Sequence, residues 1–251
     1  MENLSYIILP VVLSLLAYRT SQDLREYDRF KKLKSTKARQ ASYQKWLLQS
    51  LGLFGIGSIL ALLLIGHISN IHQPLPSLSG LLPHHTNTPL KITSDQVSFI
   101  LGICISALCS AFVFGAIARR RNHDKPIVIG DITAMLPRNN SERLWGLLLA
   151  LNAGFSEELF FRLTLPILFY IVFSNPQIAI LCSAAVFGLV HYYQGKVGVF
   201  FTFLMGIGFT YIYLLTGLIW VPMILHALVD MNGLLLQPAL QSSVRKKRKS
   251  S

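Results

Sequence analysis

Long apolar runs separated by polar segments recur along the chain. They lie at residues 4–18, 46–65, 96–118, 143–173, 178–194, 197–215 and 218–236. Most of them approach the roughly 20 residues that an α-helix needs to cross a hydrocarbon core of about 30 Å. In lipid, only helices and closed barrels satisfy all the backbone hydrogen bonds of a spanning chain. The pattern therefore predicts an all-α, polytopic transmembrane helical bundle.

The number of crossings depends on the run at residues 143–173, which is too long for a single upright span. Residues 139–142, Asn-Asn-Ser-Glu, have the composition of a helix N-cap just before it. Gly154 or Pro166 is where the run would kink or turn back. The bundle has about seven spans if this run crosses once and about eight if it is divided. We expect the single crossing.

Composition and charge agree with a membrane protein, since 52% of the residues are hydrophobic and only 14% are charged. The net charge of +12 comes from basic residues grouped between apolar runs, at 19–45, 119–143 and 245–249. Such blocks mark the cytoplasmic face of a multi-pass protein. We therefore expect a lipid bilayer and no nucleic acid as partner, with the N-terminus outside and the C-terminus in the cytoplasm. The short loops favour a prokaryotic plasma (inner) membrane.

The three cysteines, Cys104, Cys109 and Cys182, lie in apolar runs without Cys-x-x-Cys spacing, so no disulfide framework or thiolate metal site is expected.

Small and aromatic residues of the C-terminal half suggest packing roles. Gly206 and Gly208, with Gly217, are expected to permit close approach of helices. Four aromatic residues would either line a substrate cavity or lie at the lipid-facing or interfacial surface: Phe160, Phe161, Tyr192 and Tyr193.

Two adjacent carboxylates and an arginine interrupt the apolar run at 143–173. Glu158 and Arg162 are four residues apart, so they share a helix face in the favourable order for an ion pair. Glu157 is rotated by about 100° from Glu158 and points elsewhere. An unpaired carboxylate in a cavity can act as a general base on water. The alternative is a structural ion pair that locks helices together.

Two later runs carry histidines with spacing of one helical turn. Phe187 precedes His191 by four residues, and His226 precedes Asp230 by four. An aspartate beside a histidine can fix the tautomer of the imidazole. Two glutamates and two histidines on three runs can converge and hold a water molecule or a metal ion against a peptide carbonyl.

These motifs resemble those of the CPBP family of membrane endopeptidases, which includes the type II CAAX prenyl proteases and bacteriocin-processing proteins. The residues that carry the resemblance are Glu157-Glu158-x-x-x-Arg162, Phe187-x-x-x-His191 and His226-x-x-x-Asp230. The resemblance implies three segments: an N-terminal transmembrane region with a basic cytoplasmic part (1–140), a protease core (141–238) and a basic cytoplasmic tail (239–251).

The resemblance also implies catalytic roles for six residues, namely Glu157, Glu158, Arg162, His191, His226 and Asp230. Glu157 would activate the attacking water with Glu158 nearby, and Arg162 would orient the carboxylates. Asp230 departs from the asparagine common in CAAX proteases, since ionised aspartate cannot donate a hydrogen bond to an oxyanion. Asp230 is therefore protonated, or orients His226, or marks a branch with a different substrate.

The family resemblance leaves the cofactor open between zinc and no metal. Glu157, His191 and His226 would be the zinc ligands, although no His-Glu-x-x-His motif is present. The implied function is an intramembrane endopeptidase that cleaves a membrane-associated or prenylated peptide or protein. A proton-coupled transporter and a catalytically silent scaffold or immunity protein are the alternatives.

Overall fold

The computed structural model describes residues 2–71, 74–81, 98, 102 and 130–236, and within these ranges the chain forms helices and no strand. The main helices are α1 (Ser5–Lys31), α2 (Thr36–Ser50), α3 (Gly57–Ile65), α6 (Asn140–Glu158), α7 (Leu165–Phe173), α8 (Pro176–Val190), α9 (Gly195–Thr216) and α10 (Trp220–Met231). α4 is one short turn, Pro76–Ser79. The all-α prediction is confirmed for the described part of the chain.

Three π-helical stretches and several 3-10 turns complete the helices. The π stretches are η2 (Leu51–Ile56), which joins α2 to α3, η5 (Leu159–Thr164), which joins α6 to α7, and η7 (Asn232–Leu236), which follows α10. The 3-10 turns are η1 (Glu2–Leu4), η3 (Ile68–Ile71), η4 (Thr133–Met135) and η6 (Tyr192–Gln194).

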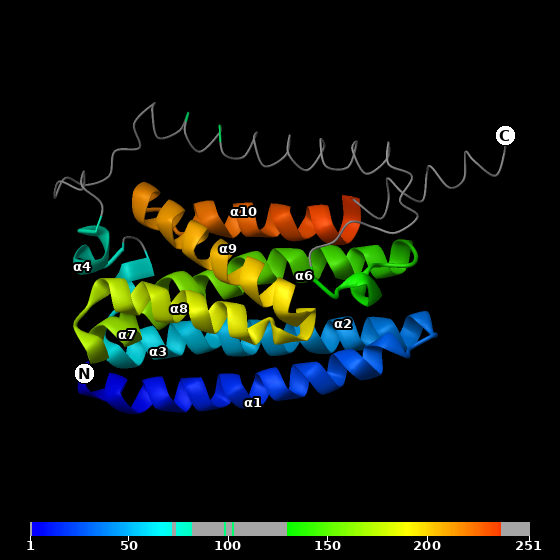
Figure 1. Ribbon diagram of the computed structural model, residues 1–251, viewed down its shortest axis with the longest axis horizontal. Coiled ribbons are helices and arrows are strands. Elements are labelled where there is room, and N and C mark those ends of the chain that lie inside the picture. Colours follow the sequence, from blue (N-terminus) through cyan, green and yellow to red (C-terminus); the bar gives the residue numbers. More distant parts are fainter. Residues whose placement is uncertain (1, 72–73, 82–97, 99–101, 103–129, 237–251) are drawn as a thin grey trace.

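The helices lie side by side, and most of them run along the long axis of the molecule (Figure 1). α1 begins at the end of the bundle where α3 stops and where α7 turns into α8. The other end holds the last turns of α1 and the beginnings of α2 and α6. The basic segment at residues 19–45 therefore lies at one end of the bundle, as a positive cytoplasmic face requires.

Two helical segments are long and apolar enough to cross a membrane, Thr36–Ile65 and Tyr192–Thr216, and two shorter helices, Pro176–Val190 and Trp220–Leu235, are apolar as well. These cover four of the predicted spans. The predicted run at 96–118, Cys104, Cys109 and the tail at 239–251 lie outside the described residues, apart from positions 98 and 102. The predicted total of seven or eight spans therefore stays a prediction.

The run at 143–173 is one continuous helical segment, since α6, η5 and α7 follow one another without a gap. Its start is capped as predicted, because the Asn139 side chain accepts a hydrogen bond of 2.9 Å from the Glu142 backbone. Neither Gly154 nor Pro166 interrupts the helical segment, so the chain does not turn back at either residue, in agreement with the expected single crossing. Proline lacks an N–H and crowds the carbonyl four residues earlier, and the wider π turns of η5 end just before Pro166.

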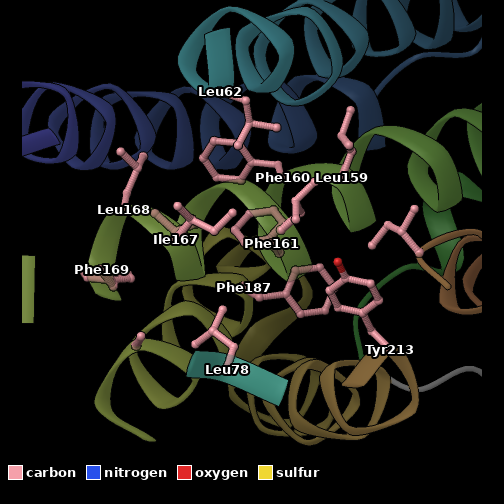
Figure 2. Packing of buried hydrophobic residues seen from close by; sticks show 14 of the residues in the cluster. Leu62, Leu78, Leu159, Phe160, Phe161, Ile167, Leu168, Phe169, Phe187 and Tyr213 are labelled. Carbon is pink, nitrogen blue, oxygen red and sulfur yellow. The ribbon is translucent and has the colours of Figure 1, made fainter. Parts of the chain in front are cut away.

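The hydrophobic core surrounds η5. Figure 2 shows Phe160 and Phe161 between Leu62 of α3 and Phe187 of α8. The Phe160 and Phe161 rings are 4.8 Å apart, and Phe161 lies 5.0 Å from Phe187. These edge-to-face contacts are favourable for aromatic rings. These contacts hold η5, the segment between Glu158 and α7, in the middle of the bundle.

Large apolar side chains also cover the outside of the helices. Exposed examples are Ile7 and Val11 on α1, Leu64 on α3, Phe200 on α9 and Ile224 on α10. A soluble monomer rarely exposes extended apolar surface of this kind. Helices that are apolar on both their inner and outer faces are typical of a lipid environment.

Glycines set the closest helix contacts. A Cβ atom on Gly154 of α6 would lie 2.5 Å from the Met223 carbonyl oxygen of α10. Gly206 packs against Ala184 of α8 as predicted, whereas a Cβ on Gly208 would meet no described residue within 4 Å. The described part of the chain therefore gives no close helix contact at Gly208. Gly217 has a φ of 68° and ends α9.

A fully buried arginine ties α2 to the start of α6. The Arg39 Nε lies 3.1 Å from the Glu142 carboxylate, and its other nitrogens donate to the Tyr43 hydroxyl and to the carbonyls of Ala134 and Leu136. Both charged side chains are 0% exposed. Every guanidinium nitrogen thus has a partner, as a buried charge requires.

Gly154→Ala should destabilise the protein, because the added methyl forces α6 and α10 apart. Gly208→Ala is the matched control, since both changes gain about 1 kcal/mol of helix propensity and only the first meets a neighbour. We expect Gly154→Ala to lose about 1–3 kcal/mol of stability by overpacking. The thermal midpoint in detergent, followed by tryptophan fluorescence, measures this. Equal midpoints for the two variants would contradict the close contact.

Arg39→Ala should lower the free energy of unfolding by about 3 kcal/mol or more, because it leaves Glu142 as an unpaired buried carboxylate. The exposed Lys37→Ala on the same helix is the control and should change the midpoint little. The same fluorescence melt gives both values. A small effect of Arg39→Ala would mean that water reaches Glu142.

Candidate active site

The centre of the candidate site is the ion pair between Glu158, at the end of α6, and Arg162 in η5. Arg162 Nη2 donates to Glu158 Oε1 at 2.9 Å, and Arg162 Nε lies 2.8 Å from Glu158 Oε2 without being aligned as a hydrogen bond. Both side chains are 0% exposed. The predicted pairing of these two residues is confirmed.

His226 of α10 completes the surroundings of Glu158. Its Nδ1 lies 2.7 Å from Glu158 Oε1, so the same oxygen accepts hydrogen bonds from Arg162 and from His226. Phe187 lies beside both partners of Glu158, with its ring centroid 4.2 Å from the Arg162 guanidinium carbon and 6.0 Å from the His226 imidazole centroid. Glu158 is therefore neutralised and held from two sides.

Glu157 points away from this pair, as its position on the helix predicts. Its Oε2 atom is buried, has no hydrogen-bond partner among the described residues, and lies 3.8 Å from His191 Nε2. His191 caps the end of α8, and its Nδ1 lies 2.8 Å from the Phe187 carbonyl oxygen. Because that carbonyl can only accept, Nδ1 carries a proton, and in the neutral form of His191 the Nε2 atom that faces Glu157 is an acceptor.

Asp230 lies at the edge of the site. Its Oδ2 atom is 3.8 Å from His226 Nε2, beyond hydrogen-bond distance, and its side chain is 34% exposed. The hydrogen bond that orients His226 is the one to Glu158. The expectation that Asp230 fixes the His226 tautomer is therefore not met, because the buried Glu158 is closer to the other ring nitrogen.

The described residues contain no group of three histidine, cysteine, aspartate or glutamate side chains close enough to share a metal ion. Glu157 and His191 face each other, but the Nδ1 atom of His226 is already bonded to Glu158. As arranged, the predicted ligands Glu157, His191 and His226 do not fit a three-ligand zinc centre.

The tertiary structure adds residues to which no motif points. Phe209 of α9 lies over His226, with ring centroids 5.5 Å apart, and its ring centroid is 5.7 Å from the Arg162 guanidinium carbon. Gly154 lets α10 approach α6 and so brings His226 to Glu158. Tyr193 lies beside His191, with ring centroids 6.0 Å apart. Only Gly154 and Tyr193 gave any sequence signal, and that of Gly154 pointed to a kink rather than to a helix contact.

The two neighbouring carboxylates, Glu157 and Glu158, have different surroundings. Glu158 has a full set of cationic partners, whereas Glu157 has none within hydrogen-bond distance. Such a pair can divide its tasks between holding the site together and accepting a proton. All six predicted site residues lie in this region and come from α6, η5, the end of α8 and α10.

Comparison with known proteins supports the same region. Residues 139–232 match the family model described as type II CAAX prenyl endopeptidase Rce1-like, and this match contains all six site residues. No curated protein and no solved structure matches the chain. The segment that builds this site is therefore similar to the type II CAAX prenyl endopeptidases.

Proposed function

We propose that the protein is an intramembrane endopeptidase that cleaves a membrane-associated or prenylated substrate with a water molecule activated by Glu157. The observation that carries this proposal is the difference between the two adjacent carboxylates. Glu158 is bonded to Arg162 and His226, while Glu157 Oε2 is buried and unpaired beside His191. A positioned base with no competing cation is what hydrolysis by activated water requires.

The gap between Glu157 and His191 suits a water molecule. Two acceptors 3.8 Å apart can each receive one hydrogen of a water held at about 2.8 Å from both. The oxygen lone pair then faces away from the two acceptors, toward a bound substrate. His191 orients the water, and Glu157 takes the proton.

The reaction then proceeds in two steps. As Glu157 removes a proton from water, the water oxygen bonds to the peptide carbonyl carbon and the carbonyl electron pair moves to oxygen. The tetrahedral intermediate collapses when the C–N bond breaks and protonated Glu157 gives its proton to the leaving nitrogen. The products are a carboxylic acid and an amine, and Glu157 is regenerated.

The remaining charged residues hold this geometry. Arg162 and His226 bind Glu158, which follows Glu157 in the chain and fixes the rotation of α6 at that point. Asp230 is partly exposed at the edge of the site and lies 3.8 Å from the Nε2 atom of His226. We derive no step through zinc, and sensitivity to a chelator is the measurement that addresses a metal.

The proposed location is the plasma (inner) membrane of a prokaryote, with several crossings and a cytoplasmic C-terminus. The apolar outer surface of the helices, the two membrane-length helices and the family match support insertion in a bilayer. Five exposed basic residues lie around the turn between α1 and α2, and they favour that end as the cytoplasmic face. They are Arg25, Arg29, Lys32, Lys34 and Lys37.

Glu157→Gln should abolish cleavage, because the amide has nearly the shape of the carboxylate but cannot accept the proton. General bases contribute about 10²–10⁴-fold in rate. The purified protein and the variant are compared on a library of fluorogenic prenylated and membrane-tethered peptides, with and without chelator. Lys196→Ala, at an exposed position outside the site, is the control for activity lost during purification. This variant should cleave as fast as the unchanged protein.

Three results separate the proposal from its alternatives. Cleavage that survives in Glu157→Gln would remove Glu157 as the base. Absence of cleavage by the unchanged protein over the whole library would count against a protease. Proton-driven solute uptake by proteoliposomes would then support the transporter, and a phenotype unchanged by Glu157→Gln would support the scaffold.

Glu158→Gln should act mainly on stability. It leaves the buried Arg162 and His226 without an anionic partner, which costs about 3–5 kcal/mol when a buried ion pair is broken from one side. Glu157→Gln removes an unpaired buried charge, so its thermal midpoint should equal or exceed that of the unchanged protein. Melts of the two variants in detergent test this contrast, and the same midpoint in both would show that the two glutamates have equivalent surroundings.

A further inference from the structure

The outward face of α1 carries apolar side chains and two arginines in one stripe. α1 lies at an edge of the bundle (Figure 1), and its residues Ile7, Val11 and Tyr18 are each more than half exposed. Arg25 is exposed as well and follows Ile7 by 18 residues, which is about five helical turns. Arg29, also exposed, follows Val11 by the same interval. The arginines therefore continue the line of the apolar side chains, with Tyr18 between the two groups.

The two arginines have no anionic partner in the described part of the chain, unlike the buried arginines of the bundle. Arg25 bonds only to Ser21, with its Nε 3.3 Å from the carbonyl oxygen and its Nη2 3.4 Å from the hydroxyl. The exposed carboxylate nearby, that of Asp28, lies 3.4 Å from the Nζ of Lys31. Arg25 and Arg29 thus present donors and positive charge to the outside of α1.

The level of Arg25 along α1 matches the polar layer of a bilayer. The apolar run of α1 ends at Tyr18, and a tyrosine at the end of a span is typical of the membrane interface. Arg25 is seven residues further on, about 10 Å along the axis. Its bonds to Ser21 bring the guanidinium back by about one turn, toward Tyr18. The group then lies about 5 Å beyond the apolar run, inside a headgroup layer about 5–8 Å thick.

This combination of side chains fits a phospholipid with a net negative charge. Residues four apart on a helix are neighbours, so one phosphate can accept hydrogen bonds from both Arg25 and Arg29. The acyl chains would follow the apolar part of the stripe at Val11 and Ile7. A zwitterionic headgroup would bring its own cation close to the two guanidinium groups, which disfavours it.

We propose that the outward face of α1 binds an anionic phospholipid, with the phosphate held by Arg25 and Arg29. This inference goes beyond the proposed peptidase and rests only on the proposed insertion in a bilayer. An acidic segment of a protein would also attract the two arginines. The apolar stripe that continues from them along the same face favours lipid, because only a lipid has chains that cover this stripe as well.

Thermal midpoints in an uncharged detergent test the site, because a ligand that binds only the folded protein raises the midpoint as its concentration increases. Phosphatidylglycerol is titrated beside phosphatidylcholine with the same acyl chains. The unchanged protein should respond to phosphatidylglycerol at a concentration about tenfold lower or less. Arg25→Gln combined with Arg29→Gln should weaken the apparent affinity for phosphatidylglycerol about 30-fold, from about fivefold for each cation near an anionic surface.

Lys34→Gln combined with Lys37→Gln is the matched control. It removes the same charge from exposed positions in the turn after α1 and at the start of α2, and it should keep the affinity of the unchanged protein. Arg25→Lys combined with Arg29→Lys keeps the charge and should stay within about fivefold. The affinity is taken from the concentration dependence of each variant's own midpoint, so a change in its lipid-free midpoint does not affect the comparison.

Three results would overturn the proposal. The first is an equal loss in the two glutamine pairs, which would show a general effect of charge. The second is an equal response of the unchanged protein to the two lipids. The third is a response to glycerol phosphate at the same concentrations as to phosphatidylglycerol, which would show a phosphate site that needs no acyl chains. Peptide cleavage plays no part in this experiment, so its outcome is independent of the comparison with Glu157→Gln.

Discussion

The buried carboxylate of Glu158 is the constraint around which the rest of the site is arranged. A carboxylate with no exposed surface is stable only if it is neutralised and fully bonded. Arg162 supplies one partner from the same helical segment, and His226 supplies the other from α10. The second contact is the stronger requirement on the fold, because it fixes how closely and at what rotation α10 must lie against α6.

The packing of the helices follows from this requirement. Gly154, one turn before Glu158, has no side chain and so admits the backbone of α10 at Met223. The π-helical stretch η5 accommodates Pro166 and places Phe161 in the core. At the other end of α6, the Arg39–Glu142 pair anchors the helix to α2. α6 is therefore fixed at both ends, and Glu157 has a defined direction even though nothing binds it.

The asymmetry between two neighbouring glutamates has a functional meaning in this setting. One carboxylate uses its charge to assemble the helices, and the other keeps its charge unpaired beside His191.

The sequence by itself determined the helical class, the position of the basic segment at one end, the N-cap at Asn139 and the pairing of Glu158 with Arg162. These features depend on local spacing and on apolar runs. Because the pitch of an α-helix is known, the spacing of two residues along the chain shows whether they share a face of the helix. It also pointed to the histidines on other helices. Only the tertiary structure decided that His226 binds Glu158 and not Asp230, and that Gly154 is a close contact with α10 and does not end the helix. Those outcomes depend on the rotation and separation of helices distant in the chain, which periodicity along one helix does not encode.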